Sequence, residues 1–327
     1  MKNILQFAGR NGALVVIGGV VLGFGVPELS DLARPYLAFA IFAFTFGSFL
    51  KFDPNSFRVE TAHVSRTLLM LAWATFGVPL AVFSLIVLFK PSPGLAQGLI
   101  FWALVPTSPA CVPFAAILGL NTTIALLATI VATAATPFYL PVLAAAMGGY
   151  QLAFDPLDVS LRLVIIVGGA FLAAVAAKRF AARFVRENPE AMTGVAVLAL
   201  FLAGLGSMRG MNAYFAAQPR LVLELILLSF ALLLGFQFLG ALLFWRSGRT
   251  PALTAGLISG TRTITLAWVV LGNDIAPLAD MFLASAMVAK YAAPALTKWL
   301  ITRLNGVELP KIQAAAAEAE RLAAPER

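Results

Sequence analysis

The sequence predicts an all-α polytopic membrane protein, and three observations support that fold class. Of the 327 residues, 61% are hydrophobic and only 12% are charged, whereas a soluble domain has about 25% charged residues. The mean hydropathy is +0.91. From Pro91 to Phe154 there is no Asp, Glu, Lys, Arg or His. Because about 20 apolar residues span the hydrocarbon core of a bilayer, this run must contain at least two helices and a turn.

Ten apolar segments follow one another along the chain and predict ten transmembrane helices. They lie at 12–26, 36–50, 67–89, 95–119, 122–147, 163–182, 191–208, 221–245, 251–273 and 278–302. The start of the chain superficially resembles a signal peptide. It has no small-residue cleavage site and further spans follow, so we interpret it as the first helix.

The distribution of basic residues predicts the orientation. If the N-terminus is inside, the inner segments before the tail carry thirteen basic residues: Lys2, Arg10, Lys51, Arg58, Arg66, Lys178, Arg179, Arg183, Arg186, Arg246, Arg249, Lys298 and Arg303. The outer segments carry five: Arg34, Lys90, Arg162, Arg209 and Arg220. Cytoplasmic loops are enriched in Lys and Arg, so we expect a multi-pass protein of the inner membrane with both termini cytoplasmic. The same loops account for the net charge of +8 without any nucleic-acid partner.

Two of the ten segments contain residues that interrupt a helix. The fourth has three prolines between Pro106 and Pro113, and each proline removes a backbone donor and clashes with the preceding turn. The ninth contains Ser-Gly-Thr-Arg-Thr at 259–263. Fourth and ninth are equivalent positions in two five-helix halves of opposite orientation. Such inverted repeats place both discontinuous helices at one crossing near the midplane.

The predicted organisation follows from these halves. The first five-helix repeat covers about 1–150. A region 1–180 contains this repeat and the first helix of the second one. The second inverted repeat covers 151–305, and 306–327 is a cytoplasmic tail. The basic stretch 178–190 is the expected hinge between the halves.

Several motifs resemble the bile acid:sodium symporter family. The sequence at 46–51 (FGSFLK) resembles the end of the family's second helix, and 136–141 (TPFYLP) resembles the end of its fifth. A weaker match covers Gly260 to Ala267 in the ninth helix. On these motifs the chain resembles a divergent bacterial homologue over most of its length. The resemblance implies that helices 1, 2, 6 and 7 form a panel, and that the other six form a core around the crossed helices.

Most of the residues that this resemblance assigns to the family's two sodium sites are altered, and of the two hydroxyls in the fifth helix only that of Thr129 survives. The positions are Ala74, Cys111, Val112, Ala125, Thr129, Ile258 and Arg262. Sodium needs several oxygen ligands, yet among these side chains only Thr129 supplies one. Arg262 brings a permanent positive charge instead. We therefore infer that Arg262 replaces the bound cation and that transport does not require sodium.

The expected function is a secondary transporter that moves a small organic anion, a carboxylate, by alternating access. An arginine at the bilayer centre costs ~2.5–3.5 kcal/mol on insertion scales, which makes it a functional candidate. Hydroxyls, free backbone N–H groups and half-helix N-termini at the breaks would also suit an anion. The candidate substrate-binding residues are Thr107, Ser108, Pro109, Ala110, Cys111, Thr261, Arg262, Thr263 and Lys290.

Each candidate also has a purely structural interpretation. Arg262 and Lys290 would bond carbonyls of the broken helices, Ser and Thr would satisfy the interrupted backbone, and Cys111 would be a small buried apolar residue. Asp280 is either a protonatable coupling residue or, as Asp usually is, a solvated carboxylate at the interface.

Other functions stay open at this stage. One alternative is a sodium symporter whose ion sites are formed by Thr129, Thr261 and Thr263. Another is an arsenite-type permease, because the thiol of Cys111 lies at the first interruption. A membrane-embedded enzyme is disfavoured, because the spans contain no paired Asp, Ser-His or His-Glu-x-x-His set. A sensor is disfavoured because no signalling domain is attached. With one Cys and one His, we expect no metal and no cofactor.

Overall fold

The computed structural model describes residues 5, 7, 12–51, 64–148, 155–182, 188–272 and 274–305. The regular secondary structure of these residues is helical. They form no β-strand, and two of them pair in one isolated β-bridge. The predicted tail at 306–327 and the centre of the predicted hinge, 183–187, lie outside the described residues.

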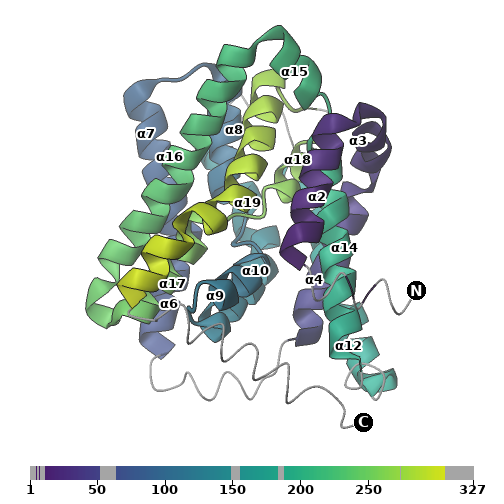
Figure 1. Ribbon diagram of the computed structural model, residues 1–327, viewed down its shortest axis with the longest axis vertical. Coiled ribbons are helices and arrows are strands. Elements are labelled where there is room, and N and C mark those ends of the chain that lie inside the picture. Colours follow the sequence, from purple (N-terminus) through teal and green to yellow (C-terminus); the bar gives the residue numbers. More distant parts are fainter. Residues whose placement is uncertain are drawn as a thin grey trace.

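One group of helices, here called the panel, is built around α14 (Pro189–Ser207). Its other members are α2 (Gly12–Gly25), α3 (Pro27–Ala33), η1 (Arg34–Tyr36), α4 (Leu37–Lys51), α11 (Pro156–Leu163), η5 (Val164–Gly168), α12 (Gly169–Phe180) and α15 (Met211–Ala217). Helix α14 packs against α2, α3 and α4, and α12 packs against α4. In Figure 1, α2, α3, α4, α12 and α14 lie together on the right.

The second group, here called the core, is built around the long helices α10 (Thr122–Gly148), α16 (Pro219–Leu243) and α19 (Pro277–Asn305). Its other members are α6 (Val64–Ala72), η3 (Trp73–Gly77), α7 (Val78–Phe89), α8 (Pro93–Leu104), α9 (Cys111–Ile117), η6 (Trp245–Ser247) and α17 (Arg249–Gly260). Helix α18 (Thr265–Leu271) follows α17 in the chain and is counted with the core, and it also contacts α4 and α11 of the panel. Helix α16 packs against α17 and α19, α19 against α8, and α10 against α8 and α9 (Figure 1).

The fold is that of an all-helical polytopic membrane protein. Six helical stretches of the described chain are long and apolar enough to cross a membrane: Pro27–Leu50, Ser65–Phe89, Thr122–Gly148, Pro156–Phe180, Met192–Ala217 and Pro219–Leu243. Two shorter apolar helices are Leu14–Gly25 and Pro93–Leu104. The division into ten crossings and two inverted repeats stays a prediction.

Two helices begin earlier than the sequence predicts. The sixth begins at Pro156 rather than 163, because Asp155 caps it: its side chain accepts from the backbone N–H of Leu157 at 2.9 Å. Asp at the N-cap with Pro after it is a favoured helix start. The second segment is helical from Pro27 rather than 36, since the turn η1 joins α3 directly to α4.

Glycines set how closely two pairs of helices approach. A Cβ at Gly19 of α2 would lie 2.5 Å from the carbonyl oxygen of Phe201 in α14. A Cβ at Gly260 of α17 would lie 2.3 Å from the carbonyl oxygen of Leu233 in α16. Small residues that let backbones touch are the usual interface of helices in membranes. These contacts fix α14 in the panel and α17 in the core.

Candidate functional site at the crossing of two interrupted helices

The first interruption separates α8 from α9. Helix α8 ends at Leu104, and Val105 is extended, with φ −63° and ψ 146°, as expected for a residue that precedes a proline. Helix α9 begins at Cys111. The break is therefore shorter than the predicted 106–113, since Pro113 lies inside the first turn of α9. A proline is tolerated there because the backbone donors of a first turn have no partner within the helix.

The second interruption separates α17 from α18, within the predicted segment. Helix α17 ends at Gly260, Thr261 is extended, and α18 begins at Thr265. No proline causes this break. Instead, the backbone from Thr261 to Thr263 makes hydrogen bonds to the first interruption.

The two interrupted segments pair with one another. Thr107 and Arg262 form an antiparallel bridge. The backbone N–H of Ser108 donates to Thr261 O at 3.0 Å, and that of Thr263 donates to Pro106 O at 2.8 Å. Two segments about 155 residues apart in the chain thus satisfy each other's backbone, as buried polar groups require. The structure brings together the two breaks that the sequence identified.

Side-chain hydroxyls satisfy further carbonyls of the crossing. Thr107 Oγ1 donates to Ile258 O at 3.2 Å, and Thr263 Oγ1 donates to Thr107 O at 3.2 Å. Thr129 Oγ1, on α10, donates to Ser108 O at 3.2 Å. These hydroxyls therefore satisfy the interrupted backbone, as the structural interpretation of them expected.

Tyr139 is part of the site, and sequence reasoning missed it. Its hydroxyl donates to Leu104 O, the last residue of α8, at 3.0 Å. The sequence did contain a signal for it: Tyr139 is a residue with a polar hydroxyl between Pro137 and Pro141, inside a span that has no charged residue. A buried tyrosine hydroxyl usually finds a hydrogen-bond partner.

Arg262 lies at the centre of the crossing with 1% of its surface exposed. Its Nη2 donates to Ala74 O at 2.7 Å and its Nη1 to Val105 O at 3.4 Å, while its Nε has no partner in the described residues. Ala74 belongs to η3, a π-helical turn, and such turns often occur at functional sites. The structure therefore joins two residues that the sequence assigned separately to altered ion-site positions.

Lys290 lies near the middle of α19 and is 2% exposed. Its Nζ is 5.0 Å from the ring centroid of Tyr291. The Tyr291 hydroxyl is buried and has no hydrogen-bond partner in the described residues. Helix α19 contacts α8 and α17, so a second cation lies in the helix that packs against both interrupted helices.

Helix ends of both polarities meet at the crossing. Helices α9 and α18, whose N-termini point to the crossing, have only seven residues each. Helices α8 and α17 have twelve each and end there with their carbonyl groups. The carboxyl end of a helix carries partial negative charge and favours cations. The half-helix N-termini lie at the crossing as expected, but the carboxyl ends of α8 and α17 oppose them, so Arg262 and Lys290 supply the full positive charges there.

A cavity of about 660 Å³, here called the Lys298 cavity, lies between panel and core. Most of its wall is apolar, and Lys298 is the one charged residue that lines it. Of the predicted site residues, Pro109 and Ala110 border it, as does the altered ion-site position Val112. The other predicted residues do not line it.

A second cavity of about 870 Å³, the Arg34 cavity, lies at the opposite end of the same interface. Asp280 borders it, and on α19 Asp280 is 18 residues from Lys298, which corresponds to about 27 Å of helix at 1.5 Å per residue. Three arginines and one carboxylate line it: Arg34, Arg162, Arg209 and Asp280.

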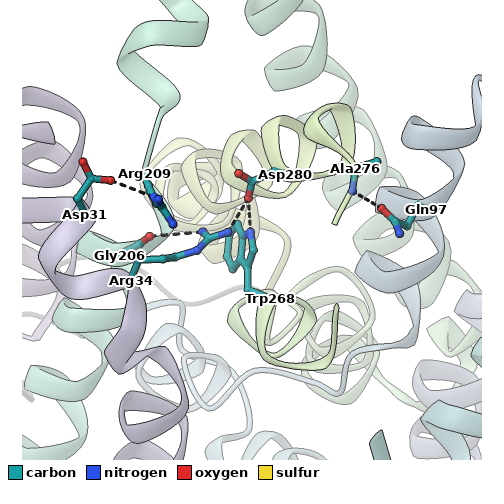
Figure 2. A network of polar contacts seen from close by, with 8 residues as sticks. All are labelled: Asp31, Arg34, Gln97, Gly206, Arg209, Trp268, Ala276 and Asp280. Carbon is teal, nitrogen blue, oxygen red and sulfur yellow. Dashed lines mark hydrogen bonds and ion pairs between the residues drawn. The ribbon is translucent and has the colours of Figure 1, made fainter. Parts of the chain in front are cut away.

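Asp280 is not the solvated carboxylate that the sequence suggested. It forms an ion pair with Arg34 at 2.8 Å and accepts a hydrogen bond from Trp268 Nε1 (Figure 2). Its side chain is 18% exposed. The interpretation of Asp280 as a solvated carboxylate was wrong, because its partner Arg34 lies 246 residues away in the sequence. Asp274, by contrast, is exposed.

The remaining altered ion-site positions are buried close to the crossing. Ala125 and Ile258 have no exposed surface, and Thr129 is 1% exposed. Cys111 is fully buried, and its Sγ lies 3.8 Å from Thr261 O. Within the described ranges, no group of three His, Cys, Asp or Glu side chains could hold a metal ion.

A scan against protein-family models finds no match, and a search of curated proteins finds no significant match. The resemblance to bile acid:sodium symporters therefore stays a prediction.

Proposed function

We propose that this protein is a secondary transporter that moves a small organic anion, a carboxylate, across the membrane by alternating access. The observation that carries the proposal is the crossing of two interrupted helices around the buried Arg262. Irregular backbone at membrane depth occurs where protein buries it or a watery cavity borders it. Broken helices at the midplane are a feature of transport sites.

The two cavities support alternating access. Both lie between panel and core, one at each end of α19, with the crossing between them. Under the orientation inferred from the basic residues, the Lys298 cavity faces the cytoplasm and the Arg34 cavity faces outward. The Lys298 cavity reaches Pro109 and Ala110 at the break, so in this conformation the crossing would be approached from the cytoplasm.

Charge supports an anion as substrate. Arg262 and Lys290 place two cationic side chains at the crossing, and there is no Asp or Glu between Arg249 and Asn273. Lys298 adds a positive charge in the Lys298 cavity. The apolar wall of that cavity favours an anion that also has an apolar body, since burial of apolar surface contributes about 25 cal/mol per Å².

The contacts of Arg262 support transport without sodium. Carbonyl oxygens are natural ligands of a hard cation, and two that meet at the crossing, Ala74 O and Val105 O, already accept from the guanidinium. The hydroxyls of Thr129 and Thr263 also donate to backbone carbonyls. A sodium ion would have to compete with a permanent internal charge for the same oxygens.

A thermal-shift scan of purified protein tests the proposal. Pantoate, pyruvate, glycolate and cholate are added in sodium and in choline salts, to the wild type and to Arg262→Gln. A ligand that binds the folded state alone raises stability by mass action. We expect a carboxylate to stabilise the wild type equally in both salts and to have no effect on Arg262→Gln.

Other results would change the conclusion. Stabilisation that requires sodium would support a sodium symporter with rebuilt ion sites. Stabilisation that survives in Arg262→Gln would remove Arg262 from the binding site. Lys290→Gln provides a second variant in case Arg262→Gln does not fold, and uptake of a labelled carboxylate into proteoliposomes separates transport from binding.

A further inference from the structure

One ion pair at the Arg34 cavity joins the panel to the core. Arg34 belongs to η1 of the panel and Asp280 to α19 of the core, and Arg34 Nη2 lies 2.8 Å from Asp280 Oδ1. Their side chains are 14% and 18% exposed. Three other ion pairs of the described chain stay within one group and are more than half exposed. They are Arg162–Asp158, Arg209–Asp31 and Arg220–Glu224.

The panel holds Arg34 in place. Its Nη1 donates to Gly206 O of α14 at 3.5 Å. A Cβ at Gly206 would lie 3.1 Å from the backbone carbon of Ala33, so α14 lies directly against the turn that carries Arg34. The turn that carries Arg34 is thus packed on α14, and its guanidinium reaches Asp280 of the core.

Trp268 of α18 and Gln97 of α8 hold Asp280 and the start of its helix in place. Trp268 Nε1, on α18, donates to the same Oδ1 that accepts from Arg34, and the Arg34 guanidinium lies 4.8 Å from the Trp268 ring centroid (Figure 2). The backbone before α19 is fixed by Gln97 of α8, which accepts from Ala276 N at 2.8 Å and donates to Asp274 O at 3.0 Å.

This arrangement is chemically a carboxylate-binding site that an internal carboxylate occupies. A guanidinium matches a carboxylate in shape and charge and also stacks on aromatic faces. Arg34 contacts both a carboxylate, Asp280, and an aromatic ring, Trp268, in a cavity that Arg162 and Arg209 also line. A free carboxylate that entered the cavity would find the same arginine and the same ring.

We propose that Arg34 is the first recognition residue for the transported carboxylate, and that Asp280 occupies this position until the substrate arrives. The inference rests on the proposed function. Substitution of one carboxylate for another keeps Arg34 paired, whereas separation without a substrate leaves Arg34 and Asp280 unpaired. Because Arg34 belongs to the panel and Asp280 to the core, the exchange also releases the two groups from each other at this end.

A cysteine reporter in the Arg34 cavity tests this mechanism. Leu37 borders the cavity and is 3% exposed, and the one natural cysteine, Cys111, is fully buried. Leu37→Cys is therefore labelled slowly by a water-soluble maleimide, in full-length protein reconstituted into nanodiscs, while this end is closed. The rate is measured in chloride, pyruvate and pantoate. It is measured in the parent reporter and with Asp280→Asn, Arg34→Gln or Asp31→Asn added.

The proposal predicts a specific pattern of rates. Pyruvate or pantoate speeds labelling of the parent several-fold over chloride. Asp280→Asn and Arg34→Gln each label fast in chloride, with no further gain from carboxylate. Asp31→Asn, which breaks an ion pair within the panel, behaves as the parent. Arg34→Gln reports independently if Asp280→Asn does not fold, as judged by gel filtration.

Two results would overturn the inference. One is labelling of both pair variants at the parent rate. The other is a carboxylate that stabilises the protein in the thermal-shift scan but does not speed labelling of the parent. If no carboxylate stabilises the protein, the proposed function fails, and recognition by Arg34 fails with it. The chloride rates of the two pair variants need no substrate and would still decide whether the pair closes this end.

Discussion

The guanidinium of Arg262 donates a 2.7 Å hydrogen bond to the carbonyl oxygen of Ala74. This bond joins the interruption between α17 and α18 to the π-helical turn η3, and the second donor reaches Val105 in the other interruption. The polar contacts of this buried cation are thus with backbone carbonyls of two further chain segments. A charge held in this way serves structure and can also attract an anion.

Replacement of Arg262 by Met separates these two roles. The variant leaves two buried carbonyls without a donor, at about 1–3 kcal/mol each, but it also removes a charge that costs ~2.5–3.5 kcal/mol at membrane depth. These terms nearly cancel, so we expect the unfolding free energy to change by less than about 2 kcal/mol while carboxylate stabilisation is lost. Thermal unfolding with and without pyruvate measures both. Intact carboxylate binding in Arg262→Met would show that the arginine is structural alone.

Adjacent glycines of α2 give a matched test of panel packing. Gly19→Ala places a Cβ 2.5 Å from Phe201 O, a backbone atom that cannot rotate away, whereas a Cβ at Gly18 meets nothing within 4 Å. Overpacking typically costs 1–3 kcal/mol, so we expect Gly19→Ala to lose about 2 kcal/mol. Gly18→Ala should be neutral or gain up to about 1 kcal/mol from helix propensity. Equal melting temperatures for the two variants would contradict the close contact of α2 and α14.

Two threonines of α10 test the support of the first interruption. Thr129 Oγ1 donates to Ser108 O as well as to Ala125 O, whereas Thr136 Oγ1 donates to Ala132 O of its own helix. Replacement of Thr129 by Val should cost about 1 kcal/mol through the lost bond to the interruption. Thr136→Val is the control, because the bond that it removes lies within α10, whereas Thr129 joins α10 to the first interruption. We expect slower transport of carboxylate only in Thr129→Val, and equal uptake rates would count against a role for Thr129.

Replacement of Trp268 by Phe tests how Asp280 is held. Phenylalanine keeps an aromatic face for Arg34 but removes the Nε1 donor to Asp280. Hydrogen bonds to charged groups contribute about 1.5–3 kcal/mol. With the Leu37→Cys reporter, we expect a labelling rate between that of the parent and that of Asp280→Asn. A rate equal to the parent's would mean that the Trp268 hydrogen bond does not help to keep this end closed.

The sequence predicted features that depend on local chemistry. A run without charge indicates membrane helices, and the closely spaced Pro106 and Pro109 indicate an interruption. Proline alone did not decide the matter, because Pro137, Pro141 and Pro294 lie inside the continuous helices α10 and α19. The second interruption was also found, from Gly260 and the polar residues after it. Helix ends were less accurate. The sixth helix begins earlier because the capping signal of Asp155 and Pro156 precedes the apolar run.

The partners of the charged residues were decided by the tertiary structure alone. Arg262 and Ala74 are 188 residues apart, and Arg34 and Asp280 are 246 residues apart. The sequence by itself determined that a buried cation lies in an interrupted membrane helix. Hydropathy and proline geometry act over a few neighbouring residues. Which carbonyl or carboxylate a cation reaches depends on how distant helices pack, and glycines such as Gly206 control that packing through the space that their missing side chains leave.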